Sequence, residues 1–100
     1  MNTTEKNKLI AEFIGWKEQE DDFMFNPKTS GSIYVKSLLF HKDWNWLMQV
    51  VEKIFKDFYK LNPCPIGLKI TIEKQLVLVD KEAVYNACIA FIEWYNNQNK

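Results

Sequence analysis

The sequence of 100 residues contains no arginine, one histidine, two cysteines and only three glycines. Without arginine it lacks the side chain best suited to bidentate contacts with guanine, phosphate or carboxylate, which argues against sequence-specific reading of DNA. With so few glycines it has neither GxGxxG nor a GxxxxGK phosphate loop, and no serine lies in GxSxG. The sequence therefore predicts no catalytic residue, no bound cofactor and no enzyme activity.

The histidine and the cysteines do not form a metal-binding motif. His41 stands near the start of a predicted helix, where a cap, a packing role or an exposed ring is the simplest interpretation. Cys64 lies between two prolines and Cys88 lies in an apolar helical run, with no ligand spacing between them. A disulfide is one alternative, and two free thiols in a reducing cytoplasm are favoured. We expect no metal site.

Charge and apolar length also restrict the class of protein. Thirteen lysines balance thirteen Asp and Glu residues, so there is no strongly basic or acidic pole. The first ten residues lack the apolar core of a signal peptide, and no run approaches the roughly 18 apolar residues of a spanning helix. The sequence predicts a soluble, cytoplasmic protein with no membrane partner.

Residues 43–61 carry the strongest periodic signal in the chain. Apolar residues recur at i, i+3, i+4 and i+7, which predicts an amphipathic helix capped by Asp43 and ended by the two prolines of segment 62–65. Trp46 lies beside the apolar stripe, and we regard it as a candidate for contact with another protein. The stripe consists of Trp44, Leu47, Met48, Val51, Ile54, Phe55 and Phe58.

The N-terminal segment predicts a first helix from about Glu5 to Ile14. Thr3 or Thr4 can cap its start, and Gly15 can end it. Trp16 follows the glycine, where an apolar residue commonly folds back on the last helical turn.

A β-hairpin is predicted between the first two helices. The runs 23–25 and 32–37 are rich in aromatic and β-branched residues, and the turn-forming segment 27–31 joins them. The acidic segment 17–22, which includes Glu18–Asp22, is interpreted as a solvated turn, since it lacks the spacing and glycine of a calcium loop.

Residues 66–79 predict two further strands, because apolar and polar residues alternate in 66–73 and leucine alternates with valine in 76–79. A three-residue loop at 73–75 would place the leucines of 76–79 on the face of the preceding isoleucines, whereas a two-residue loop would place the valines there. The three-residue loop is favoured. The alternating apolar residues of the first run are Ile66, Leu68, Ile70 and Ile72.

The last predicted helix runs from Lys81 to about Asn97 and is capped by Asp80. Its apolar surface is broad for so short a chain. If the sheet and the central helix cover both of its flanks, the protein is a monomer. If they do not, the flank around Ile89, Ile92 and Trp94 should form a homodimer across a two-fold axis.

These segments give a single α+β domain spanning residues 1–100. The predicted order is α-β-β-α-β-β-α, with an antiparallel sheet of about four strands packed with three helices. The central and last helices are expected to pack on strands from residues 66–79.

Several short motifs with spaced tryptophans extend over most of the chain. They are IAEF and GW in residues 10–16, FH, WNWLM and VVEKI in residues 40–54, and AVYNAC, FI and WYN in residues 83–96. Together they resemble small uncharacterised phage and prophage proteins, especially from the Bacteroidetes side of bacteria. The group is similar to the phage ABA-sandwich type, which implies helices on both faces of a sheet in a protein of the host bacterial cell.

The resemblance implies no particular chemistry. The absence of a catalytic constellation and the excess of aromatic residues favour a non-catalytic accessory protein that binds a host or phage protein. The alternative is weak binding of single-stranded nucleic acid, because aromatic residues and lysines interleave in Lys53–Lys60. Glu52 and Asp57 reduce the positive field there, so nucleic acid is the less favoured partner.

Overall fold

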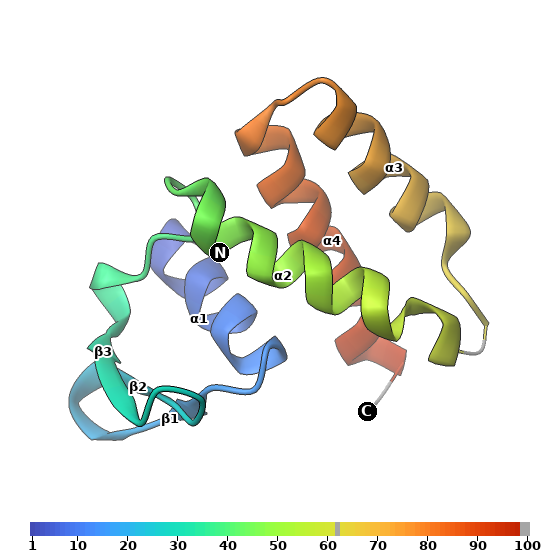
Figure 1. The fold of residues 1–100 in the computed structure, drawn as a ribbon. Helices are drawn as coiled ribbons and strands as arrows, with labels where there is room; N and C mark the ends of the chain where they lie inside the picture. Colours follow the sequence, from blue (N-terminus) through green and yellow to red (C-terminus); the bar gives the residue numbers. More distant parts are fainter. Residues whose placement is uncertain (62, 99–100) are drawn as a thin grey trace.

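Helix α4 is the element on which the other helices pack. The computed structural model describes residues 1–61 and 63–98. Within them α1, α2 and α3 all contact α4, which crosses behind α2 in Figure 1. Helix α4 buries more residues than any other helix described, so it forms the centre of the core. The elements in chain order are α1 Thr3–Phe13, β1 Lys17–Glu18, η1 Glu20–Asp22, β2 Phe23–Asn26, β3 Gly31–Tyr34, η2 Val35–Ser37, α2 Trp44–Asp57, η3 Phe58–Lys60, α3 Ile66–Val77 and α4 Lys81–Gln98.

Helix α1 begins earlier than predicted. Its cap is Asn2, whose Oδ1 accepts a hydrogen bond from the Glu5 N–H at 2.8 Å. Thr3 and Thr4, the predicted caps, lie inside the first turn. Asparagine is at least as good a cap as threonine, so the helix begins two residues earlier without losing a capping oxygen.

The end of α1 confirms the predicted glycine stop. Gly15 has φ of 99°, a left-handed conformation that glycine adopts without strain. The Trp16 N–H donates to the Ala11 carbonyl at 2.9 Å, which folds the buried indole back over the last turn.

The predicted hairpin is confirmed, and a third strand joins it. Strands β2 and β3 are antiparallel, with Met24 opposite Ile33. The second strand ends at Tyr34 and continues as the 3-10 turn η2, so it is shorter than predicted. Lys17 and Glu18 form β1 on the free edge of β2, while the rest of the acidic segment is an exposed 3-10 turn. The sheet order is β1-β2-β3.

The prediction of two strands in residues 66–79 is wrong. The segment forms helix α3, because Leu68, Ile72 and Leu76 are also spaced at i, i+4 and i+8 and can pack on α4 along one helical face. Ile72 is completely buried there. The α+β class holds, but the described residues contain four α-helices and three strands, and the sheet comes from residues 17–34.

The sheet does not form a central layer. It lies beside α1 at one end of the molecule, away from α3 (Figure 1). The expected sandwich of helices on both sheet faces is therefore not the observed arrangement. The reason is that the residues expected to extend the sheet pack as a helix on α4 instead.

The central and last helices begin where predicted. The Asp43 carboxylate accepts from the Asn45 N–H at 2.8 Å, and the Asp80 carboxylate accepts from the Ala83 N–H at 3.0 Å. Helix α2 ends at Asp57, and the 3-10 turn η3 follows it. The predicted stop is the segment 62–65, of which residue 62 lies outside the described residues. Leu47, Val51, Ile54 and Phe58 of the predicted stripe are buried, Trp44 and Phe55 are half-buried, and Met48 is exposed.

Candidate interaction surface

The four residues predicted to form an interaction surface do not meet on one surface. Ile89 and Ile92 are buried, because α4 is covered by three helices of its own chain. The predicted two-fold contact through these two isoleucines thus has no exposed surface to use. Trp94 is half-buried, with its ring centroid 6.0 Å from that of Phe91.

Trp46 belongs to an aromatic cluster inside the molecule. Its ring centroid lies 5.2 Å from that of Phe40 and 6.0 Å from that of Trp16. The Phe40 contact is edge-to-face, a favourable geometry for aromatic rings. Trp46 is half-buried and packs on the core, so it joins α2 to the end of α1 and offers only part of its ring to a partner.

Several of the most exposed aliphatic side chains lie on α3. Ile66, Ile70 and Val77 are 60%, 56% and 81% exposed. Their separations of four and seven residues place them along one side of the helix, over roughly 17 Å at 1.5 Å per residue. Leu78 and Val79, in the turn before α4, are also exposed. We call these five residues the outer face of α3.

The alternating sequence explains this exposure. In a strand, Ile66, Leu68, Ile70 and Ile72 would share one face. In a helix the same four residues divide between two opposite sides: Leu68 and Ile72 face α4, while Ile66 and Ile70 face solvent. Sequence reasoning missed the outer face because only the strand period was applied. Testing the helical period on residues 66–77 would have revealed two opposite apolar stripes.

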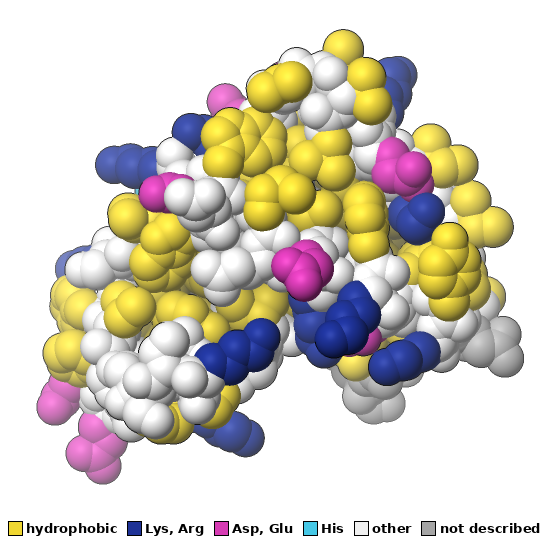
Figure 2. Space-filling view, viewed as in Figure 1, with side chains coloured by type: hydrophobic (Ala, Val, Ile, Leu, Met, Phe, Trp, Pro, Cys, Tyr) yellow, Lys and Arg dark blue, Asp and Glu magenta, His cyan; other side chains and the backbone are white. Residues whose placement is uncertain are grey.

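Figure 2 shows apolar side chains at the top and right of the molecule, where α3 and its turn into α4 lie in Figure 1. Charged side chains lie among them, including the exposed Glu73 and Lys74 of α3. The Lys69 ammonium and the Glu73 carboxylate, 2.8 Å apart, form an ion pair, and the helical spacing places Glu73 between Ile70 and Val77 on this side of α3. An exposed helix side that combines apolar residues with a paired charge is typical of a protein contact.

A buried polar network connects three segments on another side of the core. The Asn7 amide N–H₂ donates to the Leu38 carbonyl at 3.1 Å and to His41 Nδ1 at 2.9 Å, and the Tyr85 hydroxyl donates to Asn7 Oδ1 at 2.9 Å. The Leu38 carbonyl can only accept, so it fixes the orientation of the amide and makes His41 Nδ1 an acceptor.

The network holds its groups in their neutral forms. Burial, and secondarily the charge of Lys42, lower the pKa of His41 below its usual value. Burial raises the pKa of the Tyr85 hydroxyl to about 12, so this group stays a hydrogen-bond donor. Because Nδ1 of His41 is already occupied, the geometry supports a structural role for the imidazole more than proton transfer.

The cysteines are both free, as predicted. Burial raises the pKa of the Cys88 thiol to about 12, which leaves it protonated and unreactive at neutral pH. Cys64 is exposed, and its thiol donates to the Leu61 carbonyl at 3.1 Å. In the part of the chain that the structure describes, no group of three or more His, Cys, Asp or Glu side chains could hold a metal ion.

Comparison of the chain with protein-family models, curated proteins and solved structures finds no match. The fold is that of a small α+β protein, and the outer face of α3 lies open to solvent. Among the described helices, none is both long and apolar enough to cross a membrane.

Proposed function

We propose that the chain is a small phage- or prophage-encoded accessory protein of the host cytoplasm, without catalytic activity, that binds another protein through the outer face of α3. The observation that carries the proposal is the exposure of Ile66, Ile70 and Val77 on a helix whose opposite side is packed. The neutral His41 network and the protonated Cys88 thiol support a non-catalytic role.

The outer face favours a particular kind of partner. Its anchors project from a regular helix, so little conformational entropy is lost on binding. Side chains spaced at i, i+4 and i+11 suit an apolar groove that accepts one side of a helix. Covering each isoleucine or valine contributes about 1.5–3 kcal/mol when burial is complete. The proposed partner is therefore a protein with an apolar groove.

The alternative, weak binding of single-stranded nucleic acid, has less support. Phe58 is buried and Phe55 is half-buried, so neither offers an open ring for base stacking. The ammonium groups of Lys53 and Lys60 both lie near the Asp57 carboxylate, which reduces the positive field. Tyr59 is exposed, but a single ring can stack with only one base of a nucleic acid.

A double substitution on the outer face tests the proposal. Ile70→Lys combined with Val77→Lys should reduce affinity for a groove-bearing partner about 100-fold or more, since two anchors worth about 1.5–3 kcal/mol each are lost. Leu39→Lys, which places a lysine at an exposed leucine outside α3, is the matched control. Partners retained by the immobilised wild type are identified by mass spectrometry, and their affinities are then measured by calorimetry with purified components.

The proposal requires a protein that the wild type and Leu39→Lys retain and the double variant loses. Equal loss from both variants, or equal retention by all three, would contradict it. Light scattering of the free protein tests for self-association. A wild-type dimer that is lost in the double variant would mean that a second copy of the chain binds the outer face of α3. Filter binding of an oligonucleotide at rising salt tests the alternative, because phosphate contacts weaken steeply with salt.

A further inference from the structure

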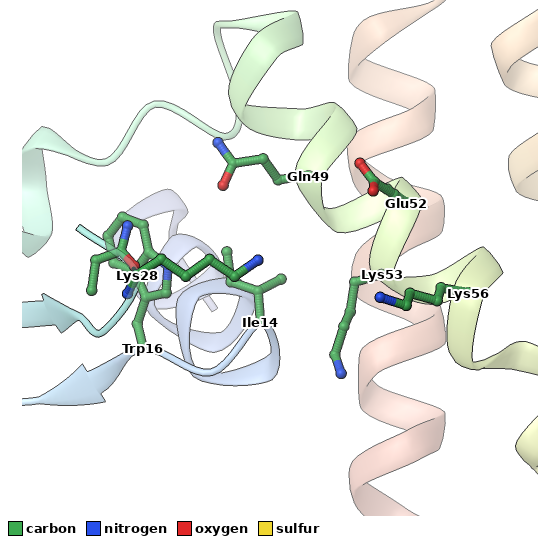
Figure 3. A pocket seen from close by; sticks show the side chains of 8 residues that line it. Ile14, Trp16, Lys28, Gln49, Glu52, Lys53 and Lys56 are labelled. Atoms are coloured by element: carbon green, nitrogen blue, oxygen red, sulfur yellow. Dashed lines mark hydrogen bonds between the residues drawn. The ribbon is translucent and has the colours of Figure 1, made fainter. Parts of the chain in front are cut away.

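We infer that a hollow between the hairpin turn and α2 binds a phosphate monoester. The hollow has a volume of about 150 Å³, which is room for a compact anion. The end of α1, the turn after β2 and one side of α2 enclose it (Figure 3). It lies away from the outer face of α3, so the inference is independent of the proposed protein contact.

Three lysines line the hollow from two elements. Lys28 comes from the hairpin turn, and Lys53 and Lys56 come from α2. In Figure 3 the Lys28 and Lys56 side chains extend toward each other across the hollow, whereas the Glu52 carboxylate points away from them. Lys53 is already in an ion pair with Asp57. Among residues 1–61 and 63–98, neither Lys28 nor Lys56 forms an ion pair.

Two amide side chains add neutral donors. The Asn26 Oδ1 atom accepts from the Lys28 N–H at 3.0 Å, which leaves the amide N–H₂ to donate elsewhere and fixes the start of the turn. The Gln49 side chain extends over the other side of the hollow in Figure 3. Ammonium and amide donors from two elements thus line the same hollow, and such groups can satisfy several oxygens of one tetrahedral anion.

Charge matching selects a monoester. A phosphate monoester carries about 1.5–2 negative charges at pH 7, which complements the two unpaired ammonium groups. Each phosphate in a nucleic-acid backbone carries a single charge. Trp16 lines the hollow but is only 7% exposed and packs against Phe40 and Trp46, so it offers no open ring on which a base could stack.

Titration with methyl phosphate, followed by the amide resonances of ¹⁵N-labelled protein, tests the inference. Saturable shifts should centre on Lys28, Gln49 and Lys56. Lys28→Gln and Lys56→Gln should each weaken binding about fivefold or more, as expected when a charge-assisted hydrogen bond is lost. Lys74→Gln removes the same charge from an exposed position on α3 and should change the affinity less than about twofold.

Further measurements identify the bound group. Affinity should fall as pH drops below about 6, where the monoester takes up its second proton, and methyl sulfate should bind more weakly than methyl phosphate. Non-saturable shifts spread over all lysines, or an equal loss in Lys74→Gln, would overturn the inference. Tighter binding of an oligothymidylate that has only diester phosphates would overturn it too. Thermal unfolding of each variant verifies that the fold is intact.

Discussion

Val79 and Gly15 occupy equivalent positions in two helix C-terminal turns, and only one of them is glycine. Their φ angles are 54° and 99°. In both turns the next residue's N–H donates to a carbonyl five residues earlier, and the backbone can close only with a left-handed residue. That conformation costs a non-glycine residue about 1–2 kcal/mol, and β-branching makes valine a poor choice for it. Val79 is 70% exposed, so burial of its side chain offsets little of this cost.

Val79→Gly should therefore raise the unfolding free energy by about 1 kcal/mol, because relief of backbone strain exceeds the added chain entropy of glycine. The melting temperature should rise by about 4–8 °C per kcal/mol in a domain of this size. Gly15→Val should do the reverse; a Cβ at Gly15 meets no heavy atom within 4 Å, so its effect is conformational. Thermal unfolding monitored by circular dichroism measures both. A loss of stability in Val79→Gly would show that the valine side chain makes stabilising contacts.

At the scale of one element, α3 has two apolar sides of different energetic value. Ile72→Ala should lower the unfolding free energy by about 2–4 kcal/mol, because it leaves a cavity against α4. Ile70→Ala should change it by about 0.5 kcal/mol or less, because the side chain is exposed. Urea denaturation of the two variants gives the difference directly. In a strand both residues would face the same way, so equal losses would contradict the helix.

At the scale of the whole molecule, the Asn7 network joins α1, the loop before α2 and α4, and it should make stability depend on pH. The pKa of His41 is lowered in the folded protein from its usual 6.5. Between the two pKa values the unfolded chain binds more protons than the folded one. The contribution of neutral His41 to the unfolding free energy is therefore complete above about pH 6.5 and is lost as the pH falls below this value.

We expect the unfolding free energy of the wild type to decline between pH 7 and pH 5. The change should be smaller in His41→Gln, where an amide oxygen can accept from Asn7 but does not titrate in this range. Asp57, whose pKa is lowered by Lys53, loses its contribution only as pH falls below its ordinary value near 3.8, outside this window. Urea denaturation at three pH values measures the slopes. Identical slopes would exclude His41 as the titrating group.

Much of the fold follows from local signals in the sequence. The period of α2 and the caps Asp43 and Asp80 predict two helices, because each signal concerns neighbouring residues whose physics is the same in any context. Gly15 predicts the end of α1 for the same reason. The hairpin follows from its turn chemistry and β-branched residues.

Other outcomes depended on what each segment packs against. The apolar residues of 66–77 fit both the strand period of two and the helical period of about 3.6. The segment is a helix because Leu68 and Ile72 can then pack on α4. The burial of Ile89 and Ile92 depends on residues 66–77 being a helix. A sheet in its place would have covered a different flank of α4. The hollow beside Lys28 and Lys56 brings together positions 28 residues apart, which no local pattern indicates.

The sequence by itself determined the α+β class, the caps Asp43 and Asp80, the glycine stop of α1 and the absence of long apolar runs, because these depend on the chemistry of adjacent residues. Only the tertiary structure decided which apolar stripe of α3 is buried and which charges share a hollow. The physical reason is that burial is a competition: a segment with two apolar sides can cover only one of them against α4, and the side that loses is exposed to solvent.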